Sequence, residues 1–228
     1  MRTTLKLVAG VTSLILLAGC AREAGGGGAF IELGKKKHTR WISAVAQKAG
    51  ADVWPGVTRL KFTLTEVDDG EVTSRTTHDW DVRAGIDTIT ENGKTLVARV
   101  NAPAETAEQS RALALHTLDT FVLLLPMKLG ESGITTLHTG GAEFDSRMYD
   151  VLTVSTTLPA PNGPFDAKVY VDPLTVLVRA LDPQNDGERL GTMTFDGYQN
   201  FNGLLISTQR RAPHGRWRLD ITDVTVTR

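Results

Sequence analysis

The chain has almost no cysteine, and neither sign of charge dominates it. Cys20 is the only cysteine among 228 residues, so the chain can form neither an internal disulfide nor a site with several thiolates. Its 25 basic and 26 acidic residues give a formal charge of −1. Nucleic-acid-binding proteins usually carry a clustered basic excess, and we therefore expect no nucleic-acid partner.

The apolar segment near the N-terminus is too short to cross a membrane. Residues Leu7–Leu17 form this segment, whereas a spanning helix needs about 20 residues. Arg2 and Lys6 precede it and small residues follow it, which is the pattern of a signal peptide. The segment ends in Leu17-Ala18-Gly19-Cys20, which resembles the lipobox of bacterial lipoproteins. The resemblance implies cleavage before Cys20 and lipidation of that cysteine.

The lipobox divides the chain into three segments. Residues 1–19 are predicted to be the signal peptide, and residues 20–35 a lipidated, glycine-rich tether. Four consecutive glycines, Gly25–Gly28, make this tether a flexible coil by composition. Residues 36–228 show no second linker and no fixed-period repeat, so we expect them to form one domain.

Strand patterns dominate this domain. Leu60, Phe62 and Leu64 alternate with polar residues, which is the period of a half-buried strand. Asp69-Gly70 and Asn92-Gly93 separate alternating runs and predict hairpin turns. Besides residues 60–65, strands are predicted at Val72–Val82, Ile86–Glu91, Lys94–Val100, Ile134–His138, Met148–Thr157, Asp166–Asp172, Val176–Asp182, Gly191–Tyr198, Gly203–Arg211 and Arg216–Thr227.

Two helices and one strand irregularity complete the secondary structure. Apolar residues at helical spacing predict a helix over Lys36–Lys48. A second helix is predicted over Glu105–Leu125; Thr106 and Gln109 have capping-box spacing, and Pro126 should end it. In the last strand the apolar residues change parity, which predicts a bulge near Thr222-Asp223.

Two segments of the second half resemble the family of the periplasmic lipoprotein carrier, the LolA-like or outer-membrane lipoprotein-sorting family. They are Val169-Tyr170-Val171-Asp172-Pro173-Leu174-Thr175 and the segment Thr194–Ser207. The resemblance covers about residues 38–228. It implies a mainly β (α+β) fold: a single antiparallel, half-open β-barrel of about eleven strands with two covering helices around an apolar cavity. It transfers no catalytic residue.

A ligand in such a barrel would contact apolar residues on the inner face. The candidates are Leu60, Phe62, Leu64, Trp80 and Phe195, each equally suited to a plain core. The histidines have no metal-site spacing. We expect His78 to lie on a strand surface and His116 on a helix flank. We therefore assign no catalytic residue, no metal and no cofactor, and expect a protein that is not an enzyme.

These features predict a membrane-anchored envelope lipoprotein whose half-barrel binds an apolar ligand: a lipid, an acyl chain or a lipoprotein. The alternative is a non-catalytic interaction or scaffold lipoprotein with a filled core; an envelope enzyme is a third reading. Ala21 follows the cysteine, where Asp would favour inner-membrane retention in enterobacterial lipoproteins. We thus expect a monomer anchored in the outer membrane and facing the periplasm.

The lipobox generates the first prediction. Replacing Cys20 with Ser removes the acceptor thiol, so the variant should appear as a folded domain in the soluble fraction. Fractionation of cells followed by immunoblotting measures this. Retention of the Cys20→Ser variant in the membrane pellet would contradict lipid anchoring at this residue.

Overall fold

The computed structural model describes residues 40–157, 165–184, 191–213 and 215–228. The predicted signal peptide and tether lie outside the described residues. So do Cys20 and residues 36–39 of the first predicted helix.

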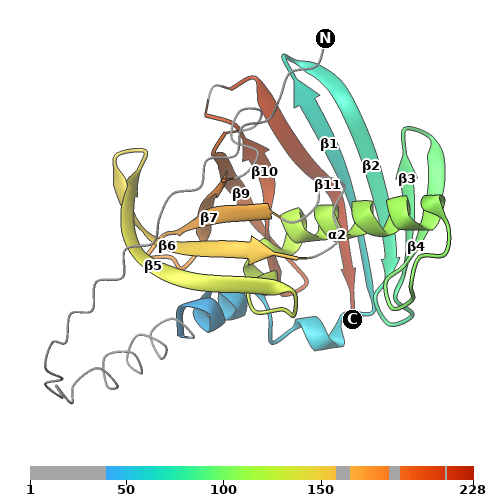
Figure 1. Cartoon of the computed structure of the whole chain (residues 1–228), viewed down its shortest axis with the longest axis horizontal. Coiled ribbons are helices and arrows are strands. Elements are labelled where there is room, and N and C mark those ends of the chain that lie inside the picture. The colour runs from blue at the N-terminus through green and yellow to red at the C-terminus, as the bar shows by residue number, and fades with distance from the viewer. Residues whose placement is uncertain (1–39, 158–164, 185–190, 214) are drawn as a thin grey trace, which may run out of the picture.

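One antiparallel sheet contains the eleven strands of the described chain, in the order β4-β3-β2-β1-β11-β10-β9-β8-β7-β6-β5. Each strand pairs with the strands before and after it in sequence, with two exceptions: β4 and β5 do not pair with each other, and β1 pairs with β11 (Figure 1). The strands are β1 (Arg59–Asp68), β2 (Glu71–Asp81), β3 (Ile86–Glu91), β4 (Lys94–Arg99), β5 (Ile134–Phe144), β6 (Arg147–Thr156), β7 (Phe165–Val171), β8 (Val178–Pro183), β9 (Met193–Phe201), β10 (Leu204–Arg211) and β11 (Trp217–Thr227). The sheet stays open, with β4 and β5 as its edges, and the predicted eleven-stranded half-barrel is confirmed.

Turn residues set the register of the hairpins, as the sequence predicts. Asp69 and Asn92 both have φ of 48°, and the glycine after each also has positive φ. These are the dihedral angles that tight two-residue hairpin turns require, and Asp, Asn and Gly adopt them most readily. The predicted bulge in β11 is also confirmed: Lys61 pairs with Thr225 but Thr63 with Thr222, and Asp223 has φ of 54°.

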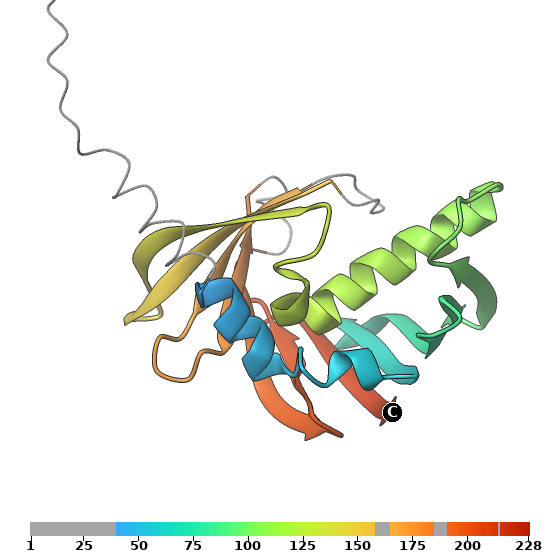
Figure 2. The same cartoon turned by 90° about the horizontal axis from the view of Figure 1, so that it is seen from below.

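The helices lie on the concave side of the curved sheet. The first helix, described over residues 40–49, is followed by a short 3-10 helix, η1 (Trp54–Gly56). The longer α2 (Ala107–Lys128) runs over the half formed by β1–β4, from beside β4 to the middle of the sheet (Figure 2). Its C-terminal half packs on two apolar clusters, one on β5–β9 and one on β1, β2, β10 and β11.

The end of α2 differs from the sequence prediction. The capping box at Thr106 and Gln109 is confirmed, but the helix continues through Pro126 to Lys128 with a kink at Leu124 (φ −108°, ψ 18°). Proline has no N–H, so the carbonyl of the residue four positions earlier, Val122, has no helical donor. Arg210 on β10 fills this role: its Nη2 donates to the Val122 carbonyl at 3.0 Å.

Arg210 is itself almost fully buried, with 1% of its surface exposed. Its Nη1 donates to the carbonyl and the hydroxyl of Ser207 at 2.9 and 2.6 Å, and its guanidinium lies 3.8 Å from the centre of the Phe195 ring. Burial lowers the pKa of Arg210 to about 10, so the side chain stays charged at neutral pH. A buried charge thus replaces the N–H that Pro126 lacks.

The kink generates a prediction about coupling between these two residues. Arg210→Met should lower the free energy of unfolding by about 2–4 kcal/mol, because it leaves buried carbonyls without a donor. In a Pro126→Ala background, the restored N–H can donate to the Val122 carbonyl. The loss should then be smaller by about 1 kcal/mol.

Urea unfolding of the four proteins of this cycle measures the coupling. Arg211→Met is the matched control: the neighbouring arginine is exposed, and its replacement should change stability by no more than about 0.5 kcal/mol. If the effects of Arg210→Met and Pro126→Ala on the free energy of unfolding were strictly additive, Arg210 would not be the substitute for the missing N–H of Pro126.

Candidate functional site

Four ionisable side chains meet between α2 and the sheet. Asp87 on β3 bonds through one oxygen, Oδ2, to Nδ1 of His78 on β2 at 2.7 Å and to Nδ1 of His116 on α2 at 2.9 Å. The other ring nitrogen of His78, Nε2, bonds to Oδ2 of Asp119 on α2 at 2.9 Å. We call this group of His78, Asp87, His116 and Asp119 the α2 latch, because it joins the helix to two strands.

The latch is enclosed by the protein. The side chains of His78 and Asp87 are 0% exposed, and that of Asp119 is 14% exposed. The ring of Phe62 stacks on His78 with centroids 4.3 Å apart, and Trp80 meets His116 edge-on at 4.7 Å. Since the aromatic rings exclude water, the charges of the latch must be balanced within it.

His78 carries a positive charge at neutral pH. Burial is the largest influence and opposes that charge, but the hydrogen bonds to Asp119 and Asp87 and the charges of both carboxylates together outweigh it. They raise the pKa of His78 to about 9. Burial likewise opposes ionisation of Asp87, yet the bonds from His116 and His78 prevail and lower its pKa. The latch therefore contains a cation between two carboxylates.

This arrangement is suited to holding a helix. His78 uses both ring nitrogens for carboxylates, so neither remains to accept a proton from a substrate. Within the described ranges, no group of three or more His, Cys, Asp or Glu side chains is placed to hold a metal ion. What the geometry provides is a directional, charged attachment of α2 to β2 and β3.

Three buried side-chain atoms in the described part of the chain have no hydrogen-bond partner: Trp80 Nε1, Asp87 Oδ1 and Arg210 Nε. All three lie where α2 meets the sheet. Trp80 and Asp87 are direct partners in the β2–β3 register, and Arg210 bonds to α2. An unpaired buried polar group costs about 1–3 kcal/mol, so this interface is less favourable than an ordinary core.

The structure brings four of the five predicted lining residues together. Leu60, Phe62, Leu64 and Trp80 belong to one buried cluster against α2, with exposed fractions between 0% and 7%. Phe195 lies in the other cluster, beneath Arg210. A hollow of 70 Å³ lies beside the kink and is lined by Ala51, Trp54, Leu124, Met127, Lys128 and Glu131. With α2 in this position, that hollow has room for about two water molecules.

The expected positions of two histidines are wrong. His78, predicted on a strand surface, is fully buried, and His116, predicted on a helix flank, is only 4% exposed. Strand parity could have predicted the burial of His78, because His78 shares a face with Trp80, a residue expected to line the interior. Nothing in the sequence pattern identified Asp87, Asp119 or Arg210, because each depends on a contact between distant segments.

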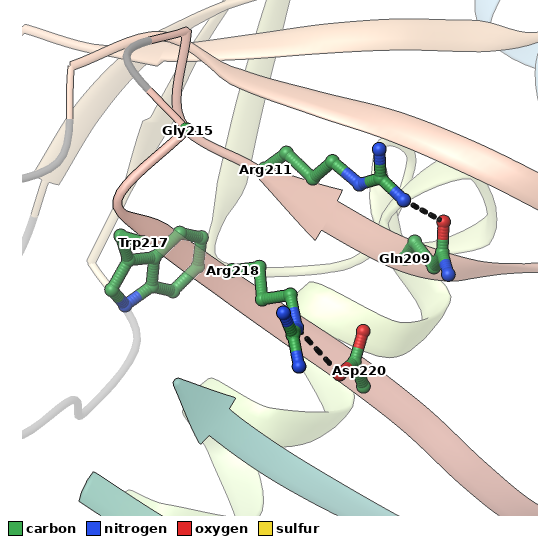
Figure 3. Close-up of a pocket in the computed structure, with 6 residues that line it drawn as sticks. All are labelled: Gln209, Arg211, Gly215, Trp217, Arg218 and Asp220. Carbon is green, nitrogen blue, oxygen red and sulfur yellow. Dashed lines mark hydrogen bonds and ion pairs between the residues drawn. The ribbon is translucent and has the colours of Figure 1, made fainter. Parts of the chain in front are cut away.

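Two larger hollows lie along the line between β10 and β11. One, of 450 Å³, is lined by Gln209, Arg211, Gly215, Trp217, Arg218 and Asp220 (Figure 3). The other, of 460 Å³, is lined by Gln199, Phe201, Thr208, Gln209, Asp220, Ile221, Thr222, Asp223 and Val224. They share Gln209 and Asp220 and therefore adjoin each other.

No helix of the described residues has the length and hydropathy that a membrane crossing requires.

An open sheet of eleven antiparallel strands with helices across its concave side defines the class of the protein: it has a LolA-like fold. The crystal structure of a LolA superfamily protein from Nitrosomonas europaea is similar to it, with a TM-score of 0.51, 10% identity, and coverage of 82% of this chain and 94% of that one.

Two other solved structures are less similar. A DUF1329 family protein from Desulfovibrio piger has a TM-score of 0.45 and 11% identity, covering 82% of this chain and 92% of that one. A putative outer membrane lipoprotein-sorting protein domain from Vibrio parahaemolyticus has a TM-score of 0.44 and 10% identity, covering 84% and 93%. No protein-family model and no curated protein sequence matches the chain.

The latch generates a prediction about pH. Because the pKa of His78 is raised to about 9 from 6.5, its contribution to stability is complete below about pH 6.5 and is lost as the pH rises through 9. The free energy of unfolding should fall over this window by up to about 3 kcal/mol. The lowered pKa of Asp87 acts at the other end, where acidification removes its contribution.

Urea unfolding of the Cys20→Ser protein at about pH 6.5 and about pH 9.5 measures the fall. Asp119→Asn removes one of the two carboxylates that raise the pKa of His78, so the fall should shrink. Glu108→Gln, at the exposed start of α2, should leave it unchanged. If the free energy of unfolding fell equally in Asp119→Asn and in its parent, the fall would not arise from the latch.

Proposed function

We propose that the protein is an envelope lipoprotein, tethered through lipidated Cys20 at the outer membrane and facing the periplasm. In this proposal its half-barrel binds an apolar ligand, such as a lipid, an acyl chain or a lipoprotein, on the sheet face that α2 covers. The LolA-like fold supports the architecture, and the lipobox sequence supports the anchor.

One observation carries the ligand-binding part: the three unpartnered buried side-chain atoms of the described chain all lie where α2 meets the sheet. In native proteins such atoms are few and call for an explanation. A helix seated over unpaired polar groups gains less from closure than one packed on a purely apolar core. These unpaired groups offset part of the free energy that α2 gains when it closes over the sheet.

Displacement of α2 would uncover a strongly apolar surface. Leu60, Phe62 and Leu64 on β1, with Trp80 on β2, face the helix and are nearly inaccessible beneath it. Exposing such side chains to water costs about 25 cal/mol for each Å² of apolar surface. A ligand that replaces the contacts of α2 must therefore be apolar itself, which favours an alkyl chain over a polar metabolite.

The tight packing of the described side chains beneath α2 favours a second candidate function. The hollow beside the kink of α2 is only 70 Å³, and the side chains around the latch pack tightly against one another. With α2 fixed in place, the domain would act as a non-catalytic interaction or scaffold lipoprotein through its outer surface. Cross-linking and pull-down from intact cells would then recover a repeatable protein partner, and membrane-purified protein would contain no ligand.

Two measurements test the ligand-binding proposal. Native mass spectrometry and lipid extraction of the protein purified from membranes should detect an apolar ligand besides the anchor. The Cys20→Ser protein should bind a fluorescent hexadecanoate analogue. Asp119→Asn should raise the apparent affinity about fivefold, because weakening the latch by about 1 kcal/mol increases the population with α2 displaced.

Glu108→Gln is the matched control, since it removes a carboxylate from the exposed first turn of α2 and leaves the latch intact. Its affinity should equal that of the parent. Absence of a co-purifying ligand, together with no binding of the probe by either the parent or Asp119→Asn, would refute this function and leave the scaffold candidate.

A further inference from the structure

The pairing between β10 and β11 is much shorter than the strands themselves. Only residues 209–211 of β10 pair with residues 218–220 of β11. On its other side β11 pairs with β1 over nine residue pairs, from Trp217 to Thr227. Residues 204–208 of β10 and residues 221–227 of β11 therefore belong to adjacent strands, but these residues do not pair with each other.

The opening between these strands is closed at its far end by a side chain. Asn202, in the turn between β9 and β10, donates through Nδ2 to the Val226 carbonyl at 3.2 Å. Between this bond and the pair formed by Gln209 and Asp220 lies the hollow of 460 Å³. Its apolar lining is Phe201, Ile221 and Val224. The volume is within the range of ordinary ligand sites, about 300–1,000 Å³.

Backbone chemistry decides which occupant suits this opening. Residues 221–224 of β11 line the hollow, and no strand pairs with them on the β10 side. An alkyl chain placed there would take backbone N–H and carbonyl groups out of water without giving them partners, at about 1–3 kcal/mol for each group. An extended peptide satisfies the same groups with its own backbone, as in β-strand addition.

Charge distinguishes one end of the groove. In the hollow of 450 Å³, Arg211 and Arg218 are direct cross-strand partners. Like charges in this position repel each other. Arg218 bonds to Asp220 at 2.9 Å, whereas Arg211 bonds to the neutral side chain of Gln209 at 2.7 Å (Figure 3). Arg218 therefore has a carboxylate partner and Arg211 a neutral one, so a carboxylate on the occupant would complete an ion pair with Arg211.

We propose that the groove formed by the two adjoining hollows binds an extended peptide segment of a protein partner. The peptide backbone pairs with β11, an apolar side chain of the peptide contacts Phe201, Ile221 and Val224, and an acidic residue of the peptide contacts Arg211 and Arg218. The site lies in the sheet, between β10 and β11, and its apolar residues Phe201, Ile221 and Val224 adjoin the cluster that α2 covers. Its occupant, a peptide paired with β11, differs from the apolar ligand proposed above, and the experiments below distinguish the two.

Synthetic peptides test this site. Acetylated Thr-Val-Thr-Val-Glu and Glu-Thr-Val-Thr-Val amides alternate apolar and polar side chains and cover both strand directions. Each is titrated into the ¹⁵N-labelled full chain carrying Cys20→Ser. At least one peptide should shift the amide signals of residues 204–209 and 220–225. Its backbone N-methylated analogue should bind at least about tenfold more weakly, because it cannot donate main-chain hydrogen bonds.

Variants test the charged end. The double change Arg211→Gln and Arg218→Gln should weaken the Glu-containing peptide about tenfold and leave its Gln-containing analogue unaffected. Arg147→Gln, an exposed arginine at the start of β6, is the matched control and should change neither affinity.

Four results would overturn the proposal: no binding of either peptide at millimolar concentration, equal binding of the N-methylated analogue, shifts confined to residues under α2, or shifts of residues 204–209 and 220–225 by hexadecanoate alone. The last result would make the opening a lipid entrance. Binding of hexadecanoate beneath α2 would bear only on the ligand-binding function.

Discussion

The buried carboxylate of Asp87 is the constraint on which the placement of α2 depends. It lies on β3 with no exposed surface, and a carboxylate in such a place must be paired or lose its charge. One partner, His78, is on the neighbouring strand, and the other, His116, is on the helix. Because both bond to the same oxygen, the helix can satisfy Asp87 in only one position along its axis. Asp119 then fixes that position from the helix side, through the second nitrogen of His78.

The second attachment of α2 also pairs a buried charge with a group on another element, but here the charge is positive. Pro126 removes a donor from the helix, and Arg210 restores it from a strand that is 88 residues away from Val122 in sequence. Buried ion pairs and buried guanidinium groups add little net stability relative to apolar packing, because desolvation offsets most of their attraction. However, a shift of α2 would leave these buried charges without partners, which is strongly unfavourable. The two attachments therefore specify where α2 lies, whereas most of the free energy that holds it comes from the apolar clusters beneath it.

Local patterns predicted most of the fold, and their successes have physical reasons. Alternation at Leu60, Phe62 and Leu64 located β1 because one face of the sheet is buried. The turns at Asp69-Gly70 and Asn92-Gly93 were predictable because positive φ restricts those positions to few residue types. The bulge at Asp223 was visible as a change of parity, since a strand that must keep its apolar side chains on one face needs an extra residue at that point.

The errors occurred where a distant segment decides the local outcome. Pro126 predicts the end of α2, a sound inference for an isolated helix, but Arg210 supplies the missing donor and the helix continues to Lys128. His78 was placed on the surface because polar residues usually are, although its parity with Trp80 pointed inward. A buried polar residue can be recognised only when its partner is known, and the partners of His78 lie on a second strand and a helix. The residues that position α2 are therefore those that sequence patterns alone could not identify. The apolar residues they cover were identifiable, because hydrophobic burial depends on period rather than on a particular partner.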